Sequence, residues 1–269
     1  MIIVIILLLL IVLYLFLIAP RMFHRADRTP FVGRHYAHRG LFDNNSEAPE
    51  NSLAAIRKAV ESGYGIEFDV QLTKDDKLVV FHDAKLMRMC GVEGNVWDYT
   101  LEELQQLKLA KSDETIPTFE EVLEVVDGKV PLIIEYKLDK VQTRVCELAD
   151  QVLSRYQGVY CVESFHPLAV IWYRKNRPDV MRGQLCEEYF RFDKYKGNVV
   201  MTAISFLVTN VTARPDFIAY NHKHESNISR RLCRRMGALS VAYTIKSEEE
   251  YQKVKDKFDL FIFDSFILK

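Results

Sequence analysis

The chain has few cysteines, and they form no recognisable pattern. Five are spread over 269 residues, and no Cys-x-x-Cys pair occurs among Cys90, Cys146, Cys161, Cys186 and Cys233. This spacing indicates neither a zinc knuckle nor a disulfide framework. We therefore expect reduced thiols, which fit a cytoplasmic domain.

An excess of positive charge is also missing. The 36 Lys and Arg residues nearly balance the 37 Asp and Glu residues, so the net charge is −1 at pH 7. Nucleic-acid binding usually needs a basic face, and no nucleic-acid partner is expected. No GxGxxG or GxxxxGK[ST] sequence follows the first expected strand, so a nucleotide-binding loop has no support.

Residues 1–19 lack any charge and are nearly all Ile, Leu and Val. In a helix this run would rise roughly 28 Å, enough to cross the hydrocarbon core of a bilayer. A cleaved signal peptide is the alternative, but the run has no positive start and no Ala-x-Ala sequence before Pro20. We expect a single-pass transmembrane anchor over residues 1–20, a basic linker over 21–33 and one domain over 34–269.

Arginines follow the apolar run at positions 21, 25 and 28. Positive charge beside a spanning helix tends to stay in the cytoplasm. The sequence therefore predicts a membrane protein whose catalytic domain faces the cytoplasm.

Short apolar runs alternate with segments of helical spacing beyond the linker. Strands are expected at residues 35–37, 65–71, 78–81, 131–135, 159–163, 180–184, 202–205, 217–220, 239–244 and 260–263. Helices are expected at residues 52–62, 100–107, 118–126, 140–156, 168–176, 226–236 and 247–257. This alternation favours a parallel sheet with helices outside it, and the length fits an α/β fold of the (β/α)8 TIM-barrel type. An open doubly wound sheet is the alternative.

Three carboxylates lie in two of the expected strands. Glu67 and Asp69 are two residues apart and so face the same side, while Phe68 between them faces the other. Glu135 ends another apolar run. Acids on one face of an apolar strand need a cation or a basic partner, although a solvated edge strand would also accept them. Three carboxylates without a Cys or His cluster suit Mg²⁺ or Ca²⁺ better than zinc.

Two histidines and two basic residues occupy similar places. His38 and His82 each follow a short apolar run, Arg39 follows His38, and Lys137 lies two residues beyond Glu135. Active sites of barrels lie at the carboxyl ends of the strands, where these residues are expected. Histidine suits acid–base work near neutral pH, and Arg39 can hold phosphate oxygens through paired donors.

These motifs resemble those of the glycerophosphodiester phosphodiesterase family over about residues 31–269. The matching stretches are Ala37-His38-Arg39-Gly40, Ala48-Pro49-Glu50-Asn51-Ser52, Glu67-Phe68-Asp69-Val70-Gln71-Leu72-Thr73-Lys74-Asp75, Val79-Val80-Phe81-His82-Asp83, Ile116-Pro117-Thr118-Phe119-Glu120-Glu121, Glu135-Tyr136-Lys137 and Ser164-Phe165.

The resemblance implies a role for each matching residue. A divalent cation, Mg²⁺ or Ca²⁺, would be held by Glu67, Asp69 and Glu135. The acid–base pair would be His38 and His82. The substrate phosphate would be bound by Arg39 and Lys137, and the site would be shaped by Glu50, Asn51 and Tyr243. The chain departs from the family pattern at Tyr243-Thr244-Ile245-Lys246 and Asp264-Ser265-Phe266, which puts the substrate range in doubt.

The expected function is metal-dependent hydrolysis of small glycerophosphodiesters to an alcohol and glycerol 3-phosphate. A phospholipase-D-like or lysophospholipid activity on the same barrel is an alternative, and a long apolar groove beside the site would favour it. An alternative of another class is a catalytically inactive, membrane-anchored protein that binds phosphodiesters. An inactive protein would be expected to lack one of the histidines or acids of the site, and none is lost.

Overall fold

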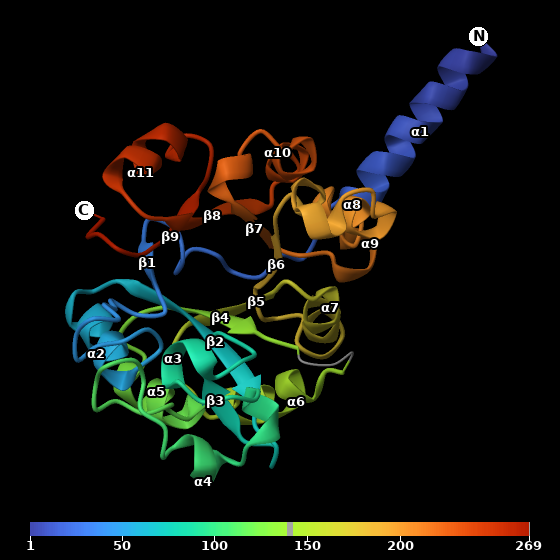
Figure 1. Cartoon of the computed structure of the whole chain (residues 1–269). Coiled ribbons are helices and arrows are strands. Elements are labelled where there is room, and N and C mark those ends of the chain that lie inside the picture. Colours follow the sequence, from blue (N-terminus) through green and yellow to red (C-terminus); the bar gives the residue numbers. More distant parts are fainter. Residues whose placement is uncertain (139–141, 269) are drawn as a thin grey trace.

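The computed structural model describes residues 1–138 and 142–268 (Figure 1). Its strands are β1 (His35–His38), β2 (Gly65–Leu72), β3 (Leu78–Val80), β4 (Leu132–Tyr136), β5 (Tyr160–Ser164), β6 (Arg182–Cys186), β7 (Phe217–Asn221), β8 (Leu239–Ile245) and β9 (Leu260–Phe263). Its α-helices are α1 (Ile2–Ile18), α2 (Leu53–Glu61), α3 (Met87–Cys90), α4 (Leu101–Leu104), α5 (Phe119–Val126), α6 (Arg144–Leu153), α7 (Pro167–Asn176), α8 (Val199–Ser205), α9 (Asn210–Ala213), α10 (Ile228–Arg235) and α11 (Glu248–Val254).

Parallel strands close into a barrel. The hydrogen-bonded order is β1-β9-β8-β7-β6-β5-β4-β2, and β1 also pairs with β2, which joins the two ends of the sheet. The remaining described strand, β3, runs antiparallel to β2 and extends it outside the barrel. The (β/α)8 prediction is confirmed, and the open doubly wound sheet is excluded because the sheet has no free edge between β1 and β2.

Apolar side chains form two layers around the strands. Ile66, Phe68 and Val70 of β2 pack in the outer layer, between the strands and the surrounding helices. A second cluster, which includes Phe31, Ile133 and Phe217, fills the barrel interior. Polar side chains are therefore displaced to one end of the interior, where the strands end.

Helix starts follow the local sequence. The Thr118 hydroxyl accepts a hydrogen bond from the backbone N–H of Glu121, and the Glu121 carboxylate accepts one from the backbone N–H of Thr118. Helix α5 begins directly after this capping box. Ser52 caps α2 in a simpler way by accepting from Ala55. Residues 140 and 141 of the helix expected at 140–156 lie outside the described part of the chain. Within the rest of that range, the structure forms α6.

The strand expected at residues 202–205 is wrong, because these residues belong to α8. Asn198 begins this helix by accepting hydrogen bonds from the backbone N–H groups of Val200 and Met201. A short apolar run fits a strand and a buried helix turn equally well, so periodicity could not separate them. The cap at Asn198 is the signal that the strand assignment overlooked.

The uncharged N-terminal run forms the single helix α1, which leaves the domain beside α9 and α10 (Figure 1). Its last residue, Ile18, is buried, whereas its first twelve residues all expose half or more of their surface. Of the helices in the described part of the chain, none has both the length and the apolar character needed to cross a membrane. The predicted membrane span is therefore not confirmed.

Candidate active site

Carboxylates from β2 and β4 converge inside the mouth of the barrel. Glu67 and Asp69 lie on β2, and Glu135 lies opposite Asp69 on β4. Each of the three offers an oxygen within 4.8 Å of those of the other two, and all three side chains are buried. Because Phe68 points outward into the core, the alternation of side chains along β2 turns both of its acids inward.

The surroundings shift the pKa values of the three acids in different directions. Burial, together with the negative charges of Asp69 and Glu135, raises the pKa of Glu67 well above its ordinary value. Burial also acts on Asp69, but the positive charge of Lys137 and its neighbours outweighs it and holds the pKa of Asp69 well below the ordinary value. For Glu135, burial prevails over Lys137 and raises the pKa. The pKa values of crowded carboxylates move apart in this way, because ionising all of them without a cation costs too much electrostatic free energy.

Lys137 supplies a positive charge beside two of the acids. Its Nζ lies 2.9 Å from Oδ1 of Asp69 and 2.6 Å from Oε1 of Glu135. Burial lowers the pKa of Lys137, but these two acids outweigh burial and raise it. The ammonium group also lies 5.8 Å from the centre of the Phe165 ring. Lys137 is thus charged and stands between the acids and the aromatic wall beside them.

A sharp turn after β1 places Arg39 at the same mouth. Arg39 has a φ of 57° and Gly40 a φ of 83°, and a Cβ on Gly40 would come within 2.7 Å of the Ala55 backbone. The Arg39 N–H donates to the Glu67 carbonyl over 2.7 Å. This left-handed geometry costs free energy and is typical of functional sites. It brings the guanidinium Nε within 3.5 Å of Oδ2 of Asp69.

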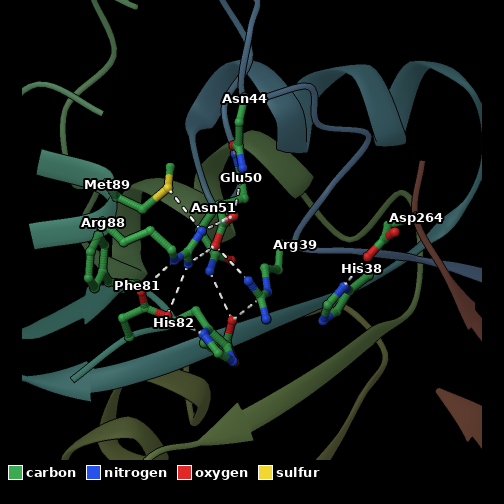
Figure 2. A network of polar contacts seen from close by, with 12 residues as sticks. His38, Arg39, Asn44, Glu50, Asn51, Phe81, His82, Arg88, Met89 and Asp264 are labelled. Atoms are coloured by element: carbon green, nitrogen blue, oxygen red, sulfur yellow. Dashed lines mark hydrogen bonds and ion pairs between the residues drawn. The ribbon is translucent and has the colours of Figure 1, made fainter. Parts of the chain in front are cut away.

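Glu50 and Asn51 connect this turn to the acids. Glu50 accepts hydrogen bonds from Nη1 of Arg39, at 2.6 Å, and from two nitrogens of Arg88, at 2.7 and 2.8 Å. Asn51, with a φ of 60°, donates from Nδ2 to Oδ2 of Asp69 over 2.9 Å. Glu50 thus holds Arg39 beside the acid cluster, and Asn51 holds one of the acids; Figure 2 shows Glu50 together with Arg39 and Arg88.

His38 is bound to a carboxylate from the last strand end. Its Nδ1 lies 2.9 Å from Oδ2 of Asp264, directly after β9, while its Nε2 lies 3.9 Å from Oε2 of Glu67. An ionised carboxylate only accepts, so Nδ1 carries the hydrogen and Nε2 faces the acid cluster. Burial, followed by the charge of Arg39, lowers the pKa of His38 to about 4 in spite of Asp264.

His82 is bound to its own neighbour in the chain. Its Nδ1 lies 2.7 Å from Oδ1 of Asp83, and Arg88 donates to both oxygens of Asp83, at 2.5 and 3.0 Å. Gln71 of β2 fixes the same loop by donating to the carbonyls of Phe81 and Asp83. In Figure 2 the two histidines lie on opposite sides of Arg39.

The structure brings most of the predicted site residues together at one mouth. The residues that meet there are His38, Arg39, Glu50, Asn51, Glu67, Asp69, His82, Glu135 and Lys137. Tyr243 lies apart from their polar contacts: its hydroxyl donates to the Cys186 carbonyl over 2.9 Å, and its ring packs edge-on against Phe165.

Sequence reasoning missed Asp264, Arg88 and Glu163. Asp264 directly follows the last barrel strand, which is the same signal that identified His38 and His82. Glu163 pairs with Glu135 across β4 and β5 and is buried, and its pKa is raised well above the ordinary value by burial and by Glu135. Arg88 offered no such signal, because it lies in a short helix away from any strand end.

The fold and the site define a (β/α)8-barrel protein with an acid cluster flanked by two histidine–carboxylate pairs. The chain belongs to the Glycerophosphoryl diester phosphodiesterase family, whose sequence profile matches residues 38–257.

Comparison with curated proteins agrees with this family. A glycerophosphodiester phosphodiesterase of Bacillus subtilis (strain 168) is 27% identical over 82% of this chain and 79% of its own length. One of Bacillus altitudinis is 37% identical over 54% of this chain and 63% of its own. Lysophospholipase D GDPD1 of Rattus norvegicus is 33% identical over 55% of this chain and 50% of its own. The last two matches span less than two thirds of those relatives.

Solved structures share the fold. A glycerophosphodiester phosphodiesterase from Thermotoga maritima has a TM-score of 0.66 and 26% identity, covering 86% of this chain and 93% of that one. An Oleispira antarctica phosphodiesterase in complex with the product sn-glycerol-3-phosphate has a TM-score of 0.71 and 24% identity, covering 87% and 94%.

Proposed function

We propose that this protein hydrolyses glycerophosphodiesters to an alcohol and glycerol 3-phosphate. The observation that carries the proposal is the convergence of three buried carboxylates between two histidine–carboxylate pairs. The alternative of an inactive binding protein lacks support, because every residue of this arrangement is present at the mouth.

A divalent cation fits the acid cluster. Oε2 of Glu67 is buried and has no hydrogen-bond partner among the described residues, so it is free to bind an ion. Carboxylate oxygens are the ligands that Mg²⁺ and Ca²⁺ prefer, and Glu67, Asp69 and Glu135 would hold the ion. When bound, it would neutralise charge on the non-bridging phosphate oxygens.

The remaining residues divide the work of hydrolysis. Arg39 and Lys137 would bind the phosphate and stabilise the charge that develops on its oxygens. One histidine would accept a proton from the attacking oxygen, and the other would protonate the leaving alkoxide, which departs poorly without a proton. Asp264 and Asp83 would each keep the hydrogen of their histidine on Nδ1, leaving Nε2 to act.

The experiment is the release of glycerol 3-phosphate from a panel of glycerophosphodiesters with different alcohol headgroups. Each substrate is assayed with added Mg²⁺ or Ca²⁺ and after removal of metal by chelator. We expect release that stops with chelator and returns with one of the two cations. Full activity after chelation, with metal content verified as absent, would contradict the cation site. No release from any substrate would contradict the proposed reaction.

An apolar cavity beside the acids favours a second candidate function, a lysophospholipase-D-like activity. The cavity, of about 570 Å³, is bordered by His82, Glu135 and Lys137. Its other walls are largely aromatic or apolar and include Trp97, Phe165, Tyr189, Tyr195, Met201 and Ile204. Such a wall can bury an acyl chain that a small glycerophosphodiester lacks. Comparing the turnover of lysophosphatidylcholine with that of glycerophosphocholine would separate the two functions.

We further propose that α1 anchors the chain to a membrane, with the catalytic domain in the cytoplasm. The support is the unbroken exposed apolar surface of residues 2–13 and the five free cysteines. Arg21 and Arg25 are already bound to the barrel, Arg21 to Asp216 at 3.5 Å and Arg25 to the Met236 carbonyl at 2.7 Å. Protease applied to intact cells would test the orientation, since digestion of the domain without lysis would contradict it.

A further inference from the structure

The stretch that leads from the end of β6 into the first turn of α8 carries an unusual outer surface. Within nine residues it exposes three large apolar side chains: Phe192 is 40% exposed, Val199 81% and Val200 64%. Two short 3-10 helices, Tyr189–Arg191 and Asp193–Tyr195, hold this segment before α8 begins. Exposed apolar side chains that cluster in this way mark an interaction surface more often than isolated ones do.

Basic side chains lie between these apolar ones. Arg191, Lys194 and Lys196 are all exposed, and Asp193 is the one acid among residues 190–200. Arg191 already binds the carboxylate of Glu188, so the two lysines carry the positive charge that is left for a partner. Lys194 lies 4.7 Å from the centre of the half-buried Tyr195 ring, so a cation stands beside an aromatic face at the edge of this surface. A mixture of exposed aromatic, aliphatic and basic groups is typical of surfaces that enter the headgroup region of anionic bilayers.

The inner side of the same segment forms a wall of the candidate active site. Tyr189 and Tyr195, with Met201 and Ile204 of α8, line the cavity that His82 and Lys137 also border. One stretch of chain therefore has its inner side chains in the site and its outer ones in solvent. A partner that binds the outer side would therefore lie beside the mouth of the candidate active site.

Helix α1 leaves the domain toward the same end of the barrel. The Tyr14 hydroxyl lies 2.6 Å from the hydroxyl of Ser229 in the first turn of α10, and Cys233, one turn later, donates to the Ile18 carbonyl over 3.2 Å. Because α10 follows β7, its first turn lies at the carboxyl ends of the strands. Toward its N-terminus, α1 thus approaches that end, and twelve more residues extend it by roughly 18 Å. Figure 1 shows the C-terminal end of α1 beside α9.

We propose that residues 190–200 dock onto an anionic lipid bilayer, so that the mouth of the site lies at the bilayer surface. The basic residues would meet anionic headgroups while Phe192, Val199 and Val200 enter the acyl boundary. A lysophospholipid held in the bilayer could then present its phosphodiester to the site without leaving the membrane. Docking itself is independent of the proposed hydrolysis. Only the effect of docking on lipid turnover rests on the proposed function.

Fluorescence quenching tests the docking without measuring activity. The full chain carrying Val200→Trp is bound to vesicles of phosphatidylcholine and phosphatidylglycerol that contain brominated lipid. Val159→Trp is the matched control, since Val159 is also exposed but precedes β5 at the opposite end of the barrel. The signal of the native Trp97 and Trp172 is subtracted by using the unchanged chain.

We expect strong quenching at position 200 and little at position 159, with less quenching at 200 after Lys194→Glu and Lys196→Glu together. No quenching at position 200, or equal quenching at both positions, would overturn the proposal. In that case the surface would be open to a protein partner or a second copy of the chain.

A second arm measures turnover. Phe192→Ser, Val199→Ser and Val200→Ser combined should slow hydrolysis of lysophosphatidylcholine in anionic vesicles by roughly tenfold and leave soluble glycerophosphocholine unaffected. Unchanged turnover of the vesicle-held lipid would contradict the docking. Failure of the unchanged chain to hydrolyse either substrate would instead contradict the proposed function and leave the quenching result standing.

Discussion

His38 and His82 each hold a carboxylate through Nδ1, but the two pairs are anchored differently. Asp264, which binds His38, comes from the far end of the chain. Its carboxylate also accepts a hydrogen bond from Ser265 and lies near the charge of the exposed Lys246. Asp83 is adjacent to His82 in sequence and is fixed by Arg88, which also binds Glu50.

The solvent exposure of the two side chains differs as well. The His38 side chain is 17% exposed and that of His82 is 32% exposed. His38 is therefore positioned by barrel closure, and His82 by a local loop network. Changes to the two pairs should therefore have separable effects.

The largest effect is expected from removing either imidazole. His38→Ala and His82→Ala should each lower kcat by about 10²–10⁴, because each loses one proton transfer of the reaction. Steady-state kinetics on glycerophosphocholine would measure this, with circular dichroism to show that the fold is kept. Turnover at the level of the unchanged chain in either variant would remove that histidine from the proposed mechanism.

Removing the carboxylate partners should cost less. Asp264→Asn and Asp83→Asn should each lower kcat about 10- to 100-fold, because the imidazole loses the partner that fixes its orientation. Only Asp264→Asn should change the pH dependence of activity through His38. If Asp83→Asn altered the profile in the same way, the two pairs would not be independent.

A smaller effect is expected at Arg88, which touches one pair alone. Arg88→Gln should lower kcat by up to about tenfold by loosening Asp83. Combined with Asp83→Asn it should add little, whereas with Asp264→Asn the two losses should multiply. A double-mutant cycle measures both couplings. Equal coupling to the two carboxylates would show that the network extends across the whole mouth.

The last effect is on stability and concerns Glu50. Burial raises the pKa of Glu50, but hydrogen bonds from Arg88 and the charge of Arg39 outweigh burial and lower it from 4.5 to about 2. A depressed pKa stabilises the fold above the unfolded value of 4.5, and that contribution is lost as pH falls through 2.

This shift corresponds to about 3 kcal/mol at neutral pH. Urea unfolding of Glu50→Gln should therefore show a stability deficit at pH 7 that shrinks toward pH 3. The exposed Glu61→Gln serves as the control and should show little deficit at either pH. A deficit independent of pH would place the role of Glu50 in packing and not in its charge.

Much of the barrel could be predicted from sequence because its signals are local. Apolar runs, capping residues such as Thr118 and the alternation along β2 identified the strands, the helices and the inward acids. The failure at residues 202–205 has the same origin, since four apolar or small residues carry no clear period. Closure of the sheet between β1 and β2 depends on contacts across the whole chain, which sequence alone left open.

The site was predictable where a residue lies at or close to the end of a strand, as with His38, His82 and Glu135. It was not predictable where long-range partners decide the role. Asp264 meets His38 only because β9 closes beside β1, and Arg88 reaches Glu50 only through the loops after β1 and β3. The network that distinguishes the two histidines was therefore visible only in three dimensions.

Calorimetry would show whether the acids between these two pairs form a cation site. The full chain, freed of metal by chelation, is titrated with Mg²⁺ and with Ca²⁺ alongside Asp69→Asn, with Asp83→Asn as the matched control. We predict one bound cation per chain, affinity weakened at least about tenfold in Asp69→Asn, and near-normal affinity in Asp83→Asn. Equal binding by the unchanged chain and Asp69→Asn, or no binding by the unchanged chain, would contradict the account.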